Sequence, residues 1–296
     1  EGVEAYNKAL SIKPDYAEAY NNMGVALKDQ SKLDEAIEAC NKALSIKPDF
    51  AEAYYNMGIA LKDQGKLDEA IEAYNKTLSI KPDYAEAYYN MGNAFKAQGK
   101  LEEGVEAYNK ALSIKPDYAE AYNNMGNALK NLGKLDEAIE VCNKALSIKP
   151  DYAEAYYNMG IALQDQGKLE EALEAYNKTL SIKPDYAEAY NNMGVTLQEQ
   201  GKLDEAIEAC NKALSFKPDH GHAYNNATEL LKIYSPKLER SHTLFAIDSK
   251  IKKISECLIN AKSSEDITNN LLEGLSCISE DKFQYKTTLS QIYKRN

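Results

Sequence analysis

Seven prolines recur every 34 residues along the first 218 positions of the chain: Pro14, Pro48, Pro82, Pro116, Pro150, Pro184 and Pro218. Each lies in a near-identical phrase such as LSIKPDY. A fixed period of this length is typical of an array of one supersecondary unit, in which each copy packs mainly on its neighbours. An array has no single core and offers a long repeated surface. We therefore expect function to lie on that surface rather than in one cluster of acid, base and nucleophile.

Each unit begins with an amphipathic helix. We number the slots of a unit from its first residue, so that Ala17 and Ala51 both occupy slot 1. In the unit 17–50, slots 4, 7, 8 and 11 hold Tyr, Met, Gly and Leu, and this spacing forms one face of an α-helix. The same spacing recurs in the later units, so the repeated helix buries the same face each time.

A turn and a second helix complete the unit. Slot 15 is Ser31 in the first unit and glycine in the five later ones, and glycine ends a helix at low cost because it accepts a positive φ. Apolar residues then return at helical spacing, and the proline at slot 32 ends the second helix because proline cannot continue it. At slot 20, Gly104 replaces the alanine of the other units. Because a glycine inside a helix is destabilising, Gly104→Ala is predicted to stabilise the chain.

These residues resemble the tetratricopeptide repeat (TPR) family. The family signature has Trp, Leu-Gly, Tyr, Ala, Phe and Pro at set intervals, and the matching residues here are Tyr20, Met23-Gly24, Leu27, Ala36, Cys40 and Pro48. The resemblance implies an all-α fold, a right-handed α-solenoid of 34-residue helix–turn–helix repeats. It predicts a partial repeat at 1–16 with the second helix only, six complete repeats at 17–220, and a degenerate repeat helix followed by a non-repeat helical segment at 221–296.

One side of the first helix is predicted to be free for binding. Slots 2, 5, 6, 9, 12 and 13 lie away from slot 4 on the helical wheel, and the resemblance implies that they look into a concave groove; we name them the groove face. Slot 6 is asparagine in every unit, namely Asn22, Asn56, Asn90, Asn124, Asn158, Asn192 and, in the degenerate unit, Asn226. An amide can pair with both the N–H and the C=O of an extended peptide. The row resembles the asparagine ladder in the TPR superhelix of O-linked N-acetylglucosamine transferase. The alternative is a surface that duplication copied without selection.

The middle two units depart from the others on this face. Slot 9 is valine or isoleucine in the outer units but Asn93 and Asn127 in the middle, and slot 13 is acidic in the outer units but Ala97 and Asn131 in the middle. These exchanges predict that the main peptide-binding site is central, although random drift also explains them. The predicted peptide-binding residues are Asn22, Asn56, Tyr89, Asn90, Asn93, Asn123, Asn124, Asn127, Asn158 and Asn192.

Two kinds of unit are present. Units with asparagine in slot 5 have cysteine in slot 24, whereas units with tyrosine in slot 5 have tyrosine in slot 24. Shared ancestry explains this pairing better than direct contact does. The slot-24 cysteines (Cys40, Cys142, Cys210) are predicted to be small buried packing residues. Because the chain has five cysteines and no CxxC pair, we expect no disulfide framework and no zinc site, and a reducing, cytoplasmic location.

Charge limits the partner classes. The net charge of −11 disfavours nucleic acid, which needs clustered positive charge, and no apolar run is long enough to span a membrane. Some members of the family grip an acidic C-terminal tail with lysine and arginine beside asparagines. Here slot 2 is glutamate in each of the six units, as at Glu18, and the repeats contain no arginine. We therefore expect a neutral to mildly basic, extended peptide or protein segment as the partner.

No catalytic pattern is apparent. His220 and His222 are two residues apart and do not share a helix face, so they are expected to lie in a solvated loop. We expect a non-enzymatic scaffold without cofactor or metal. The alternatives are a structural self-assembly module and the targeting arm of a larger enzyme whose catalytic domain is absent here. The opening helix at 1–11 has no partner in its own unit and is expected to promote end-to-end self-association. Helices predicted at 239–261 and after Ser263 are a cap or the start of a further domain.

Overall fold

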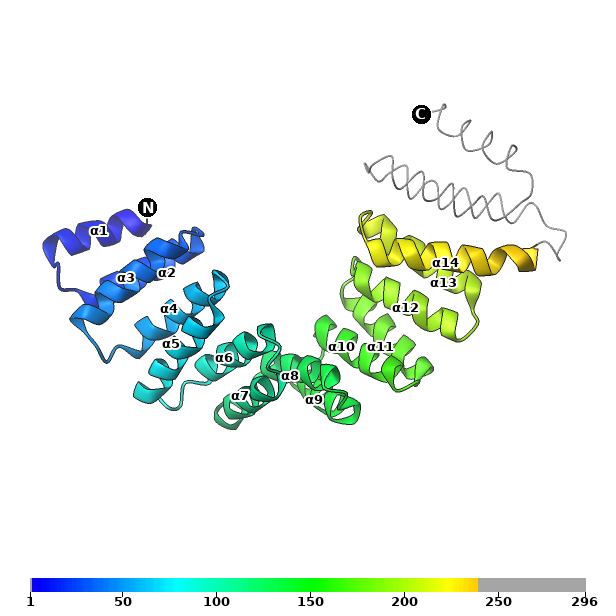
Figure 1. Ribbon diagram of the computed structural model, residues 1–296, viewed down its shortest axis with the longest axis horizontal. Coiled ribbons are helices and arrows are strands. Elements are labelled where there is room, and N and C mark those ends of the chain that lie inside the picture. Colours follow the sequence, from blue (N-terminus) through cyan, green and yellow to red (C-terminus); the bar gives the residue numbers. More distant parts are fainter. Residues whose placement is uncertain (1, 239–296) are drawn as a thin grey trace, which may run out of the picture. The chain divides into compact units, whose positions relative to one another are not determined.

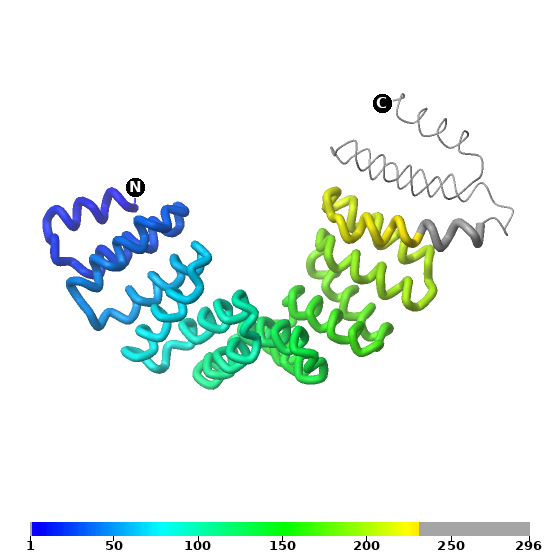
Figure 2. Tube along the Cα trace, viewed as in Figure 1, coloured from blue at the N-terminus to red at the C-terminus, as the bar shows by residue number. Residues whose placement is uncertain are grey.

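The computed structural model describes residues 2–238, with side chains for residues 2–230. This part of the chain forms helices and no strand, and it divides after Pro150 into two compact units, which are described separately (Figures 1 and 2). The first unit contains α1 (Gly2–Ile12), α2 (Ala17–Asp29), α3 (Leu33–Ile46), α4 (Ala51–Asp63), α5 (Leu67–Ile80), α6 (Ala85–Ala97), α7 (Leu101–Ile114), α8 (Ala119–Asn131) and α9 (Leu135–Ile148). The second contains α10 (Ala153–Asp165), α11 (Leu169–Ile182), α12 (Ala187–Glu199), α13 (Leu203–Phe216) and α14 (Gly221–Leu238).

Consecutive helices pack as pairs, which confirms the all-α solenoid architecture. In the first unit α2 packs on α3, α4 on α5, α6 on α7 and α8 on α9, and each pair then packs on the next. The second unit repeats this arrangement with α10 on α11 and α12 on α13, and α14 packs on α13. The predicted helices at 239–261 and after Ser263 lie outside the described residues.

The turn inside each pair has the predicted backbone. The slot-15 glycines Gly65, Gly99, Gly133, Gly167 and Gly201 have φ between 75 and 78°. At the end of α4, the backbone N–H of Lys66 donates to the carbonyl of Leu61 over 2.9 Å, which satisfies one of the carbonyls that a helix end leaves free. Ser31 holds the same left-handed conformation with φ 61°. The turn therefore depends on backbone conformation rather than on a particular side chain.

Small residues let the two helices of a pair approach closely. A Cβ added to Gly58 of α4 would lie 2.6 Å from Cε1 of Tyr74 on α5, and one added to Gly24 of α2 would lie 2.9 Å from Sγ of Cys40 on α3. Slot 20 on the facing helix is buried alanine, as at Ala36 and Ala70. Slots 8 and 20 are therefore sites of close approach between the two helices of a pair.

Gly104→Ala is expected to raise the free energy of unfolding by about 0.5–1 kcal/mol, because alanine lowers the backbone entropy lost on folding. The added Cβ would meet the carbonyl oxygen of Gly92 at 3.3 Å, a tight contact, and the slot-20 alanines Ala70 and Ala138 of the neighbouring repeats are accommodated in buried positions. Urea denaturation measures the change. A loss of stability would show that this pair of helices is packed more closely than the others.

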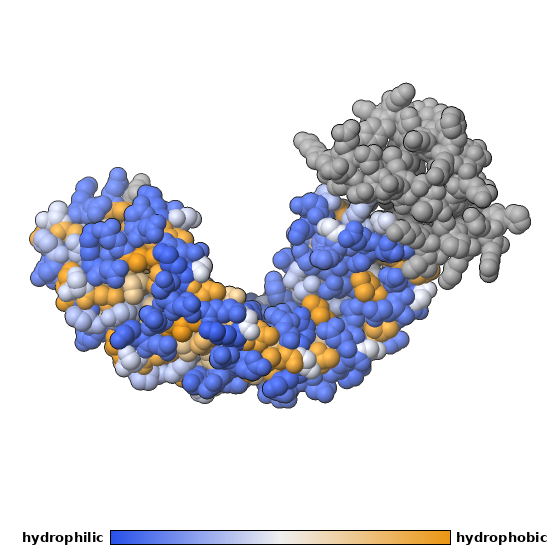
Figure 3. Space-filling view, in the orientation of Figure 1, coloured by the Kyte–Doolittle hydropathy of each residue, from blue (hydrophilic) through white to orange (hydrophobic). Residues whose placement is uncertain are grey.

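The surface is mainly hydrophilic, with apolar residues scattered among charged ones on the face seen in Figure 3. The recurring exposed apolar residues occupy slot 30, including Ile46, Ile80 and Ile114 at 37–38% exposure. Ile12, at the end of α1, is 86% exposed. Self-association through α1 remains a prediction. None of the described helices has the length and apolar character needed to cross a bilayer.

Candidate peptide-binding face

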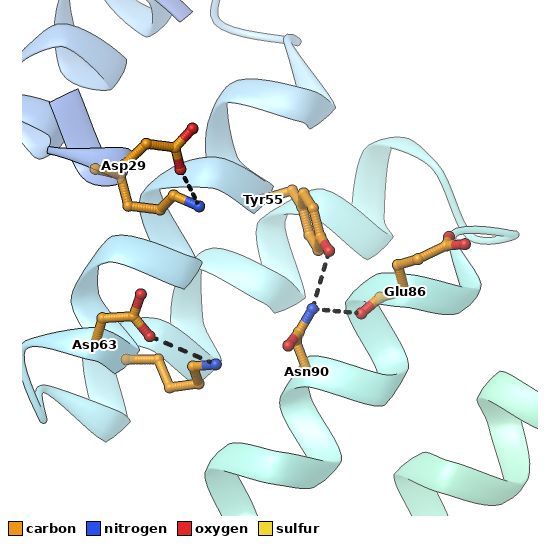
Figure 4. A network of polar contacts seen from close by, with 7 residues as sticks. Asp29, Tyr55, Asp63, Glu86 and Asn90 are labelled. Carbon is orange, nitrogen blue, oxygen red and sulfur yellow. Dashed lines mark hydrogen bonds and ion pairs between the residues drawn. The ribbon is translucent and has the colours of Figure 1, made fainter. Parts of the chain in front are cut away.

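Five slot-6 asparagines donate a hydrogen bond to the preceding repeat, namely Asn56, Asn90, Asn124, Asn192 and Asn226. In the first unit, Nδ2 of Asn56 donates to Oδ1 of Asn21 over 2.9 Å, and Nδ2 of Asn90 donates to the hydroxyl of Tyr55 over 2.9 Å. Asn90 also donates to the backbone carbonyl of Glu86 over 3.1 Å, and Figure 4 shows its side chain reaching from α6 toward Tyr55 on α4. The asparagine row therefore links one first helix to the next.

The central residues form a connected network. Nδ2 of Asn124 donates to the hydroxyl of Tyr89 over 3.0 Å and to Oδ1 of Asn93 over 2.9 Å. The same Oδ1 accepts the hydroxyl of Tyr108 over 2.7 Å. Nδ2 of Asn123 donates to Oδ1 of Asn124 over 3.5 Å. Four of the predicted site residues, Tyr89, Asn93, Asn123 and Asn124, are thus brought together by contacts within the protein.

The remaining predicted residues vary in their surroundings. Asn22 is exposed and accepts from Nδ2 of Asn21 over 3.3 Å. In the second unit Asn192 donates to the hydroxyl of Tyr157 over 3.1 Å, and Asn158 is half-buried. Asn127 is also half-buried, and neither a side-chain hydrogen bond nor an ion pair engages it within residues 2–230. Of the two middle slot-9 amides, Asn127 is therefore the one whose hydrogen-bonding groups are all available.

Slot 5 is buried where it is asparagine, contrary to what the helical wheel predicts, and half-buried where it is tyrosine. Asn21, Asn123 and Asn191 are only 5–7% exposed. Slot 5 lies 100° around the helix from slot 4, and slot 4, which the wheel takes as the buried centre, holds tyrosines such as Tyr20 and Tyr190 that are only partly buried. In addition, Asn21 and Asn191 accept hydrogen bonds from the next asparagine in the row, Asn56 and Asn226. The wheel describes one isolated helix and omits the neighbouring repeat, which covers this slot.

In the tyrosine units the residues of slots 5 and 24 are in direct contact, which the shared-ancestry interpretation does not require. The rings of Tyr55 and Tyr74 lie 6.2 Å apart, and those of Tyr89 and Tyr108 lie 6.1 Å apart, at tilted angles that suit aromatic pairs. Tyr89 also contacts Tyr118 at 4.8 Å. A tyrosine in slot 5 therefore packs on the core tyrosine behind it and on the slot-34 tyrosine at the end of its own repeat.

The cysteine units have small buried thiols, as predicted. Cys40, Cys142 and Cys210 are free and at most 1% exposed. Burial raises the pKa of each thiol to about 12. They stay protonated at neutral pH and act as packing groups rather than nucleophiles.

The buried slot-24 tyrosines differ in whether the hydroxyl has a partner. The Tyr108 hydroxyl donates to Asn93, and the Tyr176 hydroxyl donates to Oε1 of Gln164 over 2.9 Å. In the repeat of Tyr74, slot 9 is Ile59 and offers no acceptor, and the Tyr74 hydroxyl is buried without a hydrogen bond. Asn93 thus has a structural role, because it accepts the hydrogen bond of the buried Tyr108 hydroxyl.

Tyr74→Phe is expected to raise the free energy of unfolding by about 1 kcal/mol, whereas Tyr108→Phe and Tyr176→Phe lower it by about the same amount. The sign differs because only Tyr74 buries a hydroxyl without a partner. Chemical denaturation of the three variants, with the wild-type chain as reference, tests this. A change in the free energy of unfolding of the same sign in all three variants would contradict this prediction.

His220 is buried rather than solvated. It is 8% exposed, and its Nδ1 accepts a hydrogen bond from the backbone N–H of Ala223 over 3.2 Å at the start of α14. Its ring centroid lies 6.3 Å from that of His222. Position 220 is slot 34, where the other repeats have tyrosine or phenylalanine, so the histidine packs as they do and also caps the following helix.

The slot-2 glutamates are not free charges. Each pairs with the lysine that follows the second helix of its own repeat: Glu18–Lys47, Glu52–Lys81, Glu86–Lys115, Glu120–Lys149, Glu154–Lys183 and Glu188–Lys217, with N–O distances of 3.0–3.9 Å. Exposed pairs of this kind contribute little stability. They do offset the acidic character that the sequence gives to this face.

Comparison with known proteins identifies the class. Sequence models described as "TPR repeat" match residues 1–31, 60–99 and 92–133, and models described as "Tetratricopeptide repeat" match 17–50, 39–72, 117–185 and 187–220. The chain belongs to the tetratricopeptide repeat family, whose repeats generally mediate protein–protein interactions. No curated protein matched the chain as a relative.

Solved structures agree with this assignment. The chain is 27% identical to YrrB, described as a TPR protein with an unusual peptide-binding site, with a TM-score of 0.54 over 63% of this chain and 96% of that one. It is 31% identical to MamA, with a TM-score of 0.52 over 55% of this chain and 95% of that one. PilF of Pseudomonas aeruginosa, at 19% identity, has a TM-score of 0.63 over 72% and 97% of the two chains and supports the fold alone.

Proposed function

We propose that the chain is a non-enzymatic scaffold that binds an extended peptide or protein segment along the groove face. The observation that carries the proposal is the preorganised amide row. The hydrogen bonds to Asn21 and Tyr55 hold Asn56 and Asn90 in one orientation, and no hydrogen bond within the described residues occupies Oδ1 of either asparagine. An acceptor that is already ordered loses little entropy when it takes a peptide N–H.

The partner is proposed to be neutral to mildly basic as a whole. In the second unit, slot 13 is acidic at Asp165 and Glu199, while slot 12 holds Gln164 and Gln198 instead of lysine. A mildly basic segment complements these carboxylates. The protonated, unpaired thiols suit a reducing compartment, and we propose the cytoplasm.

A library of extended peptides tests the function. The binding variant carries Asn56→Ala, Asn90→Ala and Asn127→Val, the last being a residue that slot 9 already accepts at Val25. We expect it to lose peptide binding. Melting temperatures are measured in parallel, because two of these asparagines also link neighbouring repeats.

The chain offers a matched control. Slot 25, on the second helices, holds the exposed asparagines Asn75, Asn109 and Asn143 in the same stretch of the array. Changing these three to alanine should leave binding intact. Equal binding by the two triple variants would reject the amide row as the receptor. If no peptide binds to the wild-type chain, the self-assembly alternative is favoured.

A further inference from the structure

Lysine is present in slot 12 of the four repeats in the first unit, but its surroundings differ. Lys28 pairs with Asp29 over 3.0 Å and Lys62 pairs with Asp63 over 3.6 Å. Figure 4 marks both ion pairs with dashed lines at the labelled carboxylates. In the next repeat, slot 13 is Ala97, and Lys96 has no carboxylate partner within residues 2–230. The exchange of an acid for alanine therefore leaves one cation of this face uncompensated.

The next repeat does not compensate Lys96 either. In the second unit, Nε2 of Gln164 in slot 12 donates to Oε1 of Glu199, which is slot 13 of the following repeat, over 3.2 Å. The equivalent neighbour of Lys96 is Asn131, which carries no charge. Both slot-13 positions within reach of Lys96 are thus neutral.

The register of the neighbouring helix places amide groups near this lysine. The hydrogen bond from Asn124 to Asn93 sets the register between α8 and α6, and one helical turn further along both helices are Asn127 and Lys96. The side chain of Lys96 is half-buried, and burial lowers the pKa of its amine. An ammonium that has lost part of its hydration without gaining a counter-charge, next to amide N–H donors, favours an anion.

We propose that Lys96, with the amides of Asn127 and Asn131, forms a subsite for the carboxylate of an aspartate or glutamate side chain in the bound peptide. The inference rests on the proposed function and adds to it a specificity-determining position. An otherwise neutral to mildly basic peptide would carry one acidic residue at this point. The ammonium and the amide N–H groups donate to the two carboxylate oxygens.

The test uses C-terminally amidated octapeptide libraries that are random except at one central position, fixed as glutamate, glutamine or phosphoserine. Amidation removes the terminal carboxylate, and a free-acid library restores it as a separate arm. The wild-type chain is expected to bind the glutamate library about tenfold more tightly than the glutamine library. A stronger preference for phosphoserine, or for the free terminus, would overturn the assignment to an acidic side chain.

Three variants test whether the preference for glutamate comes from Lys96. Ala97→Asp recreates the pairing that Lys62 has with Asp63 and should abolish the preference for glutamate while Lys96 stays in place. Lys96→Gln introduces the residue that slot 12 accepts at Gln164 and should have the same effect. Lys62→Gln, the matched control, should keep the preference.

The outcomes separate the two proposals. Binding of all libraries without a preference for glutamate, or loss of the preference in Lys62→Gln as well, would overturn the subsite and leave peptide binding standing. A wild-type chain that binds none of the libraries would reject peptide binding and the subsite with it.

Discussion

Replacing Tyr108 by cysteine is expected to lower the free energy of unfolding by about 3 kcal/mol, because it removes a fully buried ring and leaves a cavity. Tyr108 is 0% exposed, contacts the ring of Tyr89, and donates its hydroxyl to Asn93. Cysteine does occupy this slot in other repeats, at Cys40 and Cys142, but asparagine then occupies slot 5. Sequence similarity between the units would suggest a mild exchange, whereas the contacts predict a costly one.

A double-mutant cycle decides whether the slots are coupled. Tyr89→Asn, Tyr108→Cys and the combined variant are compared by urea denaturation, and the double change should cost less than the sum of the two single changes by about 1 kcal/mol. The combined variant has the slot-5 and slot-24 residues of the unit that begins at Ala119. If the free-energy changes of the two single variants simply add, shared ancestry explains why these residue types occur together in slots 5 and 24.

The architecture followed from the sequence because its signals are local. The turn glycines, the prolines at slot 32 and the spacing of apolar residues each act within one repeat, and the helices end where these residues predict, as α4 does two residues before Gly65. Because the unit is repeated, each helix pair has a nearly identical pair to pack against. A strong local pattern copied six times leaves little freedom in how the elements pair.

The chemistry of the groove face was less predictable because it depends on contacts between repeats. Asn90 and Tyr55 are 35 residues apart, and only the stacking of the helix pairs brings them together. For the same reason the sequence did not reveal that Asn93 serves the buried Tyr108, or that Glu86 is paired with Lys115. The sequence shows exchanges between repeats, such as alanine for an acid at position 97. It does not show which side chain each exchange leaves without a partner.

Gly92→Ala is expected to lower the free energy of unfolding by about 1–3 kcal/mol, although alanine is the better helix former. A Cβ at this position would lie 2.6 Å from Cε1 and 2.8 Å from Cδ1 of Tyr108, far inside van der Waals contact. The ring is held by Tyr89 on one side and by the hydrogen bond to Asn93 on the other, so it has little room to move. Relief requires the two helices of the pair to separate.

Gly104→Ala provides the control, since it lies on the facing helix of the same pair and makes the same chemical change. There the nearest atom to the added Cβ is a backbone oxygen at 3.3 Å, and the equivalent alanines of the other repeats are accommodated. Thermal or urea unfolding should therefore move in opposite directions for the two variants. If both stabilise, helix propensity outweighs packing at slot 8; if both destabilise, this helix pair tolerates no added methyl group at all. Opposite signs would show that close approach at slot 8, rather than flexibility, is the reason that a glycine occurs there in each complete repeat.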